Sequence, residues 1–120
     1  MPTLHHLALR VADPERAAAF YGGLLGLAEL RRDRGPEGPR AIWLRAGDTV
    51  LMLERHLRGA GESAGSGHLL ALTADDLAAC EARLAAAGVA VEDRTPHTLY
   101  FRDPDGHRVG LSTFPFELRD

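Results

Sequence analysis

The chain of 120 residues contains no lysine, so all 14 of its basic residues are arginines. Acidic residues number 17, and the net charge of -3 offers no basic excess of the kind that binds nucleic acid. Its one cysteine, Cys80, excludes an internal disulfide, which fits a reducing cytoplasm. Long apolar runs and a signal-peptide pattern are also absent, so we expect a cytoplasmic protein with no membrane partner.

The sequence does contain a repeat of itself, which is the first feature to seek when a fold is assigned. In both halves an apolar run starts at a histidine, reaches Ala-Asp, becomes rich in alanine and ends at a glycine. The matched pairs are His6 with His68, Asp13 with Asp75, Ala17 with Ala79, and Gly26 with Gly88. A segment rich in glycine and serine separates the halves, which predicts module 1 at 1–57, a linker at 58–67 and module 2 at 68–120.

Each module is expected to contain one helix and four strands. In module 1, Asp13 and Pro14 mark the start of a helix that Gly26 ends. In module 2, Asp75 is the expected helix cap, and Cys80 lies as a core residue on an apolar stripe. That stripe is Leu77, Cys80, Leu84 and Ala87. The strands are expected near 6–11, 28–34, 40–45, 49–55, 68–73, 89–94, 98–102 and 107–113.

This order of elements predicts an α+β fold, with two tandem βαβββ modules forming a curled, barrel-like mixed sheet and the helices outside. Strand periodicity gives each module a face toward its helix and a face toward a cleft that would hold a small-molecule ligand or substrate. The helix face would carry Leu7, Leu9, Val11, Leu51, Leu53, Val109 and Leu111. The cleft face would carry His6, Arg10, Met52, Glu54, His68, Arg108, Gly110 and Ser112, with His5 on the opposite side.

Two histidines and a glutamate are candidate metal ligands. A twofold relation between the modules would bring the imidazoles of His6 and His68 together in the cleft, where they could bind a divalent metal. Glu54 would complete a set of two histidines and one carboxylate, which suits iron, manganese or zinc. The alternative for each of them is an ordinary polar side chain on the surface of a strand.

Five segments carry a resemblance to a known family. In the first half they are His6-Leu-Ala-Leu-Arg-Val11, Asp13-Pro-Glu-Arg16 and Phe20-Tyr-Gly-Gly-Leu-Leu-Gly26. In the second half they are Gly67-His-Leu-Leu-Ala-Leu72 and Phe101-Arg-Asp-Pro-Asp-Gly106. Together they resemble the vicinal oxygen chelate superfamily of glyoxalases, bleomycin resistance proteins and extradiol dioxygenases. The resemblance implies paired modules, a small-molecule ligand, a homodimer and, in many members, a divalent metal such as iron, manganese, zinc or nickel.

The resemblance also implies where that metal would be held, on the first and last strands of the modules. His6 and His68 match the first-strand ligands, but Met52 and Gly110 stand at the last-strand positions and donate no oxygen. The departure favours a metal-free small-molecule-binding protein of the bleomycin-resistance type. The alternative is a metal-dependent, glyoxalase-like lyase, isomerase or dioxygenase that acts on a substrate with vicinal oxygens. A third reading is a remnant module with a structural or interaction role.

The remaining candidates would contact the ligand itself. Arg10 resembles the arginine that binds a substrate carboxylate in glyoxalase I, and Arg108 lies on the same face of the last strand. Trp43 and Tyr100 occupy matching places in the two modules and, with Met52, would line the cleft. The histidines expected to lie outside the site are His56, His97 and His107, the last two at exposed turns.

Overall fold

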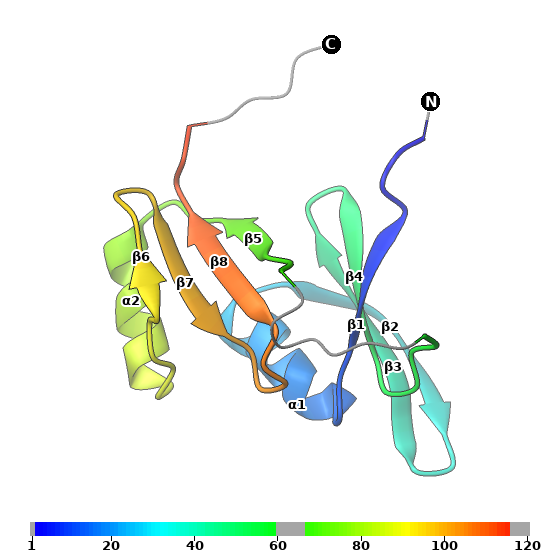
Figure 1. Ribbon diagram of the computed structural model, residues 1–120. Coiled ribbons are helices and arrows are strands. Elements are labelled where there is room, and N and C mark those ends of the chain that lie inside the picture. The colour runs from blue at the N-terminus through cyan, green and yellow to red at the C-terminus, as the bar shows by residue number, and fades with distance from the viewer. Residues whose placement is uncertain (1, 60–66, 116–120) are drawn as a thin grey trace. The chain divides into compact units, whose positions relative to one another are not determined.

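The computed structural model describes residues 2–59 and 67–115, and the chain divides into two compact units. The described part of unit 1 is 2–59 together with the turn Asp103–Gly106, and that of unit 2 is 67–102 and 107–115. Most of the predicted linker, residues 60–66, lies outside the described residues. No helix in the described ranges is long and apolar enough to span a bilayer. Figure 1 labels the elements of both units.

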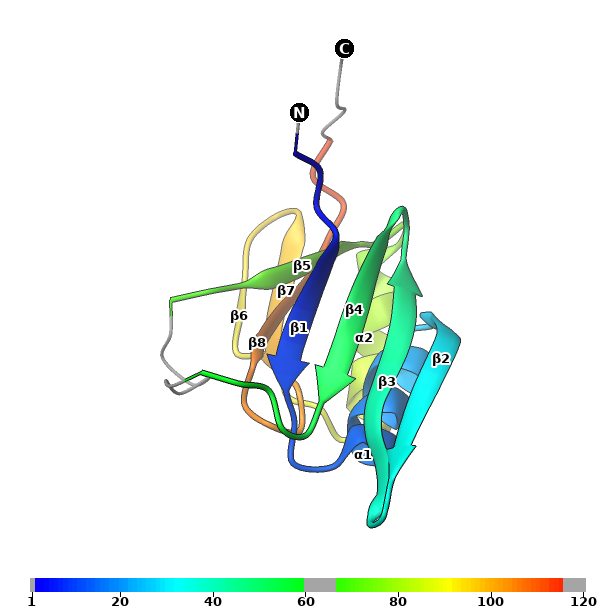
Figure 2. The same cartoon turned by 90° about the vertical axis from the view of Figure 1, so that its right-hand side faces the viewer.

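Unit 1 is built on a four-stranded sheet, here called sheet 1, with the strand order β1-β4-β3-β2. Its elements are β1 (His6–Arg10), α1 (Pro14–Ala18), the π-helical turn η1 (Ala19–Leu24), β2 (Ala28–Gly35), β3 (Gly38–Ala46) and β4 (Thr49–Glu54). The β1–β4 pair is parallel, and the other two pairs are antiparallel. Figure 2 looks onto sheet 1 with α1 behind it. The buried side chains of Ile42, Leu44, Leu51 and Leu53 form the core of this unit.

Unit 2 repeats the arrangement in sheet 2, with the strand order β5-β8-β7-β6. Its elements are β5 (Leu70–Thr73), α2 (Leu77–Ala86), β6 (Asp93–Arg94), β7 (Thr98–Arg102) and β8 (Arg108–Ser112). Leu99, Phe101, Val109 and Leu111 are buried, as are Cys80 and Leu84 of α2. The predicted core position of Cys80, which is 5% exposed, is therefore confirmed.

The α+β class and the two βαβββ modules are confirmed, with corrections in detail. Hydrogen bonds organise the described strands into two separate four-stranded sheets, not one barrel-like sheet. The strand expected at 89–94 is observed only at Asp93–Arg94, at the edge of its sheet, where it pairs with β7 alone. Leu7, on the edge strand β1, is 38% exposed, and Ala87 is exposed at the end of α2. His107, expected to be exposed, is buried.

The helix caps show that the predicted match between the two modules is shifted by one residue at the start of the helices. Asp13 caps α1 as predicted, since its side chain accepts from the backbone N–H of Glu15. The matching cap of α2 is Asp76, whose Oδ1 accepts from the N–H of Ala79 at 3.1 Å, and not Asp75. The offset between the modules at this point is therefore 63 positions (76 minus 13), whereas Gly26 and Gly88 differ by 62.

The π-helical turn η1 explains the change of offset. At the end of α2, the N–H of Val89 bonds to the carbonyl of Leu84 at 2.9 Å, across five positions. At the end of η1, the N–H of Leu27 bonds to the carbonyl of Tyr21 at 3.0 Å, across six. A π-helical turn holds one residue more than the α-helical turn it replaces. Module 1 thus carries an additional residue between Tyr21 and the glycine that ends its helix.

Candidate functional site

Most of the candidate site residues of module 1 lie on one face of sheet 1. Residues paired across neighbouring strands project to the same side of a sheet. The register pairs Ala8 with Met52, Arg10 with Glu54, and Trp43 with Met52. This surface, the Trp43 face, comprises His6, Ala8 and Arg10 of β1, Val50, Met52 and Glu54 of β4, and Ala41, Trp43 and Arg45 of β3. The predicted common face of His6, Arg10, Met52 and Glu54 is confirmed by this register.

The centre of the Trp43 face is a stack of flat groups. The imidazole of His6 lies 6.3 Å from the Trp43 ring, centroid to centroid, with an interplanar angle of 29°. The guanidinium carbon of Arg31, on β2, lies 5.7 Å from the Trp43 centroid. The indole Nε1 is buried and has no hydrogen-bond acceptor in the described part of the chain. The face therefore combines an aromatic surface, a cation and an unsatisfied donor.

Arg10 has a structural role on this face that the sequence did not indicate. Its Nη2 donates to the carbonyl oxygens of Leu57, at 2.8 Å, and Gly59, at 2.5 Å. These contacts tie β1 to the segment that follows β4. These carbonyl oxygens occupy part of the hydrogen-bonding capacity of the guanidinium. The binding of a substrate carboxylate by Arg10 stays a prediction.

Sheet 2 has a corresponding face. Tyr100 pairs with Gly110, and Arg102 with Arg108, so these side chains project to the same side as Thr98 and Ser112. The guanidinium carbon of Arg108 lies 4.6 Å from the Tyr100 ring centroid, within the range of a cation–π contact. The hydroxyls of Thr98 and Ser112 are 2.8 Å apart and hydrogen-bonded. Tyr100 and Arg108 therefore share one surface.

Leu69, and not His68, occupies the place in unit 2 that His6 occupies in unit 1. In unit 1, Leu7 pairs with Leu51, and in unit 2, Leu70 pairs with Val109. Leu51 and Val109 precede Met52 and Gly110, the matched last-strand positions, so Leu7 corresponds to Leu70. Counting back one residue, His6 corresponds to Leu69 and His5 to His68. The predicted match of His6 with His68 is therefore wrong. A slip of one residue reverses the face of a strand residue. The side chains of Leu69 and Thr98 lie 3.6 Å and 3.5 Å from the place where a Gly110 side chain would begin.

These substitutions do not fit a metal centre of the family type. At the last-strand position of unit 2, Gly110 offers no carboxylate and is covered by a leucine. In unit 1 the last-strand position holds Met52, which offers no oxygen either, while His6 shares a hydrogen bond with His5 through Nδ1 at 2.8 Å. The described residues contain no group of three or more His, Cys, Asp or Glu side chains that could hold a metal ion. His6 and His68 belong to different units, so their joint role as ligands stays a prediction.

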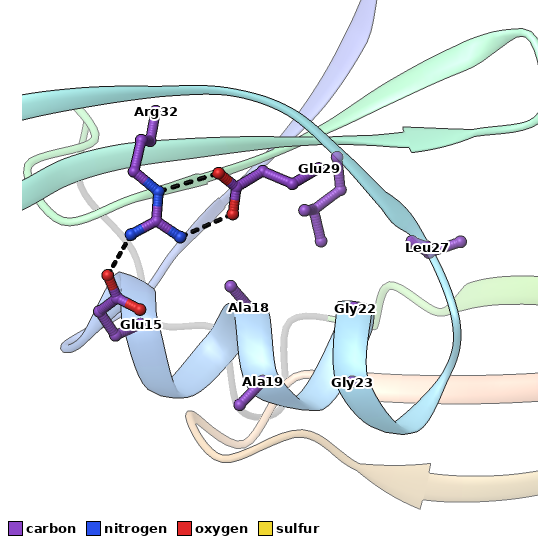
Figure 3. A pocket seen from close by; sticks show the side chains of 9 residues that line it. Glu15, Ala18, Ala19, Gly22, Gly23, Leu27, Glu29 and Arg32 are labelled. Carbon is purple, nitrogen blue, oxygen red and sulfur yellow. Dashed lines mark hydrogen bonds and ion pairs between the residues drawn. The ribbon is translucent and has the colours of Figure 1, made fainter.

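A second feature of unit 1, missed from sequence, is an ion network beside a shallow cavity (Figure 3). Arg32 makes a two-pronged contact with Glu29, at 2.9 Å and 2.6 Å, and also pairs with Glu15 of α1. The hydrogen bond from Arg32 lowers the pKa of Glu29, and the two carboxylates raise the pKa of Arg32. Ala18, Gly22 and Leu44 are among the small and apolar residues that line the adjoining volume of about 330 Å³. The network ties β2 to α1.

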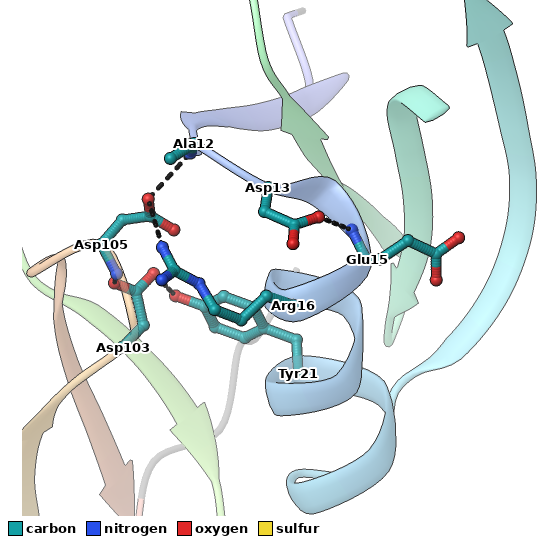
Figure 4. Close-up of polar contacts among 7 residues, drawn as sticks. All are labelled: Ala12, Asp13, Glu15, Arg16, Tyr21, Asp103 and Asp105. Atoms are coloured by element: carbon teal, nitrogen blue, oxygen red, sulfur yellow. Dashed lines mark hydrogen bonds and ion pairs between the residues drawn. The ribbon is translucent and has the colours of Figure 1, made fainter. Parts of the chain in front are cut away.

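The Asp-Pro-Asp-Gly turn is a structural anchor of unit 1 (Figure 4). The hydroxyl of Tyr21 donates to Oδ2 of Asp103, and burial together with this carboxylate raises the pKa of the phenol far above its usual value. Oδ1 of Asp105 accepts from the N–H of Ala12 at 2.8 Å and from Arg16 at 3.3 Å. The carboxylates of Asp103 and Asp105 therefore fasten the turn to the start of α1 and to η1.

Comparisons with known proteins agree with this architecture. The family model described as "Glyoxalase/Bleomycin resistance protein/Dioxygenase superfamily" matches residues 3–111. A protein of Vibrio cholerae serotype O1 named "Probable lactoylglutathione lyase" is 30% identical over 120 residues, covering 88% of this chain and 86% of the relative. "Glutathione transferase FosA" of Serratia marcescens is 29% identical over 119 residues, covering 92% and 80%. The crystal structure of TnmS3, an antibiotic binding protein from Streptomyces sp. CB03234, has 30% identity and a TM-score of 0.72, covering 93% and 95%.

Proposed function

Because the chain belongs to the glyoxalase/bleomycin resistance protein/dioxygenase superfamily, we propose that it binds a small molecule without the metal centre of the enzymatic members. The Trp43 face is the proposed binding surface. The observation that carries the proposal is the pair Leu69 and Gly110, which replaces a histidine and a carboxylate by a leucine packed over a glycine. No catalytic step is assigned, since a binding protein needs none.

The ligand class follows from the chemistry of the Trp43 face. A flat aromatic or conjugated ring system can stack on Trp43 beside His6, in place of the exposed side chain of Arg31. The buried indole Nε1 has no acceptor in the described part of the chain, so a carbonyl or hydroxyl oxygen of the ligand could satisfy it. We therefore propose a planar aromatic compound with hydrogen-bond acceptors. An antibiotic has a precedent as the ligand, because TnmS3 is an antibiotic binding protein.

Fluorescence provides a direct test, since Trp43 is the single tryptophan of the chain. Titration with a panel of planar aromatic antibiotics and with bleomycin should quench or shift the Trp43 emission, whereas fosfomycin, which has no aromatic ring to stack, should not. His6→Ala should weaken binding about tenfold if the imidazole contributes to the stack. His97→Ala, an exposed histidine of unit 2, is the matched control. An emission unchanged by every aromatic compound would reject the Trp43 face as the ligand surface.

The absence of a metal requirement has its own readout. We expect elemental analysis of the purified protein to find no stoichiometric metal, and EDTA to leave the affinity for the aromatic ligand unchanged. One metal ion per chain, lost in His6→Ala or His68→Ala, would instead support the metal-dependent lyase or dioxygenase.

We propose further that the protein acts as a homodimer in the cytoplasm. Large apolar side chains are exposed in each unit, among them Leu4 and Leu7 in unit 1 and Leu69 and Phe114 in unit 2. Such side chains are common in subunit interfaces. Light scattering coupled to size-exclusion chromatography should give the mass of two chains, and a mass of one chain at high concentration would contradict the proposal.

A further inference from the structure

A second cavity of unit 1, of about 320 Å³, lies at the turn between β2 and β3. It is lined by Gly35–Pro39, which include the turn and the strand ends beside it, and by Arg40, Arg55 and His56. Figure 2 shows the β2–β3 hairpin extending beyond the end of β4, which leaves this turn without a strand beside it. The volume is within the range of sites for small ligands.

The backbone brings two arginines together at this cavity. The N–H of Arg55 bonds to the carbonyl of Arg40 at 3.0 Å, which continues the β3–β4 pairing one step past Glu54. Side chains of adjacent positions in an antiparallel pair project to the same side, and like charges placed in this way repel each other. An anion between the two guanidinium groups would relieve that repulsion.

Arg55 also has unused hydrogen-bonding capacity. Its Nε is buried and has no hydrogen-bond partner in the described part of the chain. The one acid that lines the cavity, Glu37, has a side chain that is 79% exposed, and its Oε2 lies 3.6 Å from Nη1 of Arg55. At that distance the pair is a weak, solvent-screened contact. The positive charges of Arg40 and Arg55 and the unpaired Nε–H of Arg55 therefore both favour the binding of an oxyanion.

We propose that this cavity binds a small carboxylate that carries a flat ring. The carboxylate would accept from the guanidinium of Arg55, including the buried Nε, in the two-pronged geometry that arginine offers to carboxylates. Pro36 and Pro39 provide apolar wall for the ring. Arg40 and His56 would add donors at the rim.

This site is separate from the Trp43 face. Glu54 belongs to the Trp43 face, and Arg55, the next residue, projects to the other side of the sheet by strand period. Arg40 lines this cavity together with Arg55 and is not one of the residues of the Trp43 face. The two proposals can therefore succeed or fail independently of each other.

The test uses benzoate as the probe and the intact protein at low ionic strength. Amide shifts in ¹H–¹⁵N correlation spectra should follow benzoate with a Kd on the order of 1 mM, centred on residues 35–40 and 55–56. Benzamide, which has the ring but no charge, should produce no shifts there. Inorganic phosphate is the second arm. Weaker binding of phosphate than of benzoate supports a ring carboxylate, and stronger binding overturns that choice of ligand.

Three variants separate the role of Arg55 from its charge alone. Arg55→Lys keeps the charge but has no donor at the Nε position, and it should weaken benzoate binding about tenfold. Glu37→Gln removes the competing acid and should tighten binding about threefold. Arg34→Lys, on the exposed side of the same hairpin, is the matched control and should leave the affinity unchanged.

The ¹H–¹⁵N spectrum of each variant shows whether its fold is perturbed. If Arg55→Lys perturbs the fold, the expected increase in benzoate affinity of Glu37→Gln still tests the proposal. Shifts spread over the chain, an affinity indifferent to both Arg55→Lys and Glu37→Gln, or equal binding of benzamide would overturn the proposal.

Discussion

The hydroxyl of Tyr21 and the carboxylate of Asp103 meet in a 2.6 Å hydrogen bond across 82 positions of sequence. Both side chains are buried, with exposures of 0% and 5%. The other carboxylate oxygen of Asp103 accepts from the N–H of Asp105 at 2.9 Å, so the bond also braces the turn. A long-range polar contact in a buried setting has a high cost when one partner is lost, because the other is left without its hydrogen bond.

Tyr21→Phe is therefore expected to destabilise the protein by about 1–3 kcal/mol. The aromatic ring is kept, so the loss reports on the hydroxyl and on the carboxylate left behind. Urea unfolding followed by circular dichroism measures it. Tyr100→Phe, which alters a half-buried tyrosine of unit 2, is the control and should cost less than about 0.5 kcal/mol. Equal losses in the two variants would show that the Tyr21 bond adds nothing.

The same bond predicts a loss of stability at alkaline pH. Burial and Asp103 raise the pKa of Tyr21 above its ordinary value of 10.0. Above about pH 10 the unfolded chain releases this proton while the folded chain retains it, so the free energy of unfolding falls as pH rises. Below that pH the full stabilisation is present. Because the chain has no lysine and two tyrosines, few other groups titrate in this window.

Urea unfolding at pH 8, 9, 10 and 11 should show the decline in the parent protein. Tyr21→Phe should show a flatter profile, since it has lost the group that titrates. Parallel pH profiles of the two proteins would contradict the assignment of the decline to Tyr21.

The helix cap of unit 2 tests the one-residue offset between the modules. Asp76→Ala removes the side chain that accepts from the N–H of Ala79, and should cost about 1 kcal/mol. Asp75→Ala is the matched control, one position away and exposed, and should be within about 0.5 kcal/mol of the parent. A larger effect at Asp75 than at Asp76 would restore the offset of 62 that the sequence suggested.

Gly110 tests the packing at the position where the family usually has a carboxylate. The contacts of a new Cβ there are ordinary van der Waals distances of 3.5–3.6 Å, so Gly110→Ala should be neutral or stabilising by about 0.5–1 kcal/mol. Gly110→Glu must displace the side chain of Leu69 and should be destabilising. Shortening Leu69 to alanine should recover part of that loss in a double-mutant cycle measured by thermal unfolding. Additive effects would show that Leu69 does not cover Gly110.

Local patterns in the sequence were sufficient for most of the fold. The strand 98–102 was predicted with its observed bounds, because alternating apolar residues end at a Pro-Asp-Gly turn. Asp13 was identified as a cap because Pro14 fixes the first helical position. Strand parity also placed His6, Arg10 and Met52 on one face, because the alternation of side chains needs no tertiary information.

The errors arose where two local signals conflicted or where distant contacts decide. Asp75 and Asp76 are both good caps, and their sequence neighbours do not distinguish them. The partners of Arg10 are backbone carbonyls of Leu57 and Gly59, which carry no mark in sequence. The link from Arg32 to Glu15 likewise depends on how the helix lies against β2.

The π-helical turn η1 makes the length of the first helix adjustable. Its additional residue lies between Tyr21 and Gly26, before β2 begins. It therefore does not change which side chains of the sheet 1 strands project to each face. A single-codon insertion or deletion in this stretch would be absorbed by switching between α and π hydrogen bonding. Such a turn allows the helices of the two modules to differ in length by one residue, while the strand residues that contact a ligand keep their arrangement.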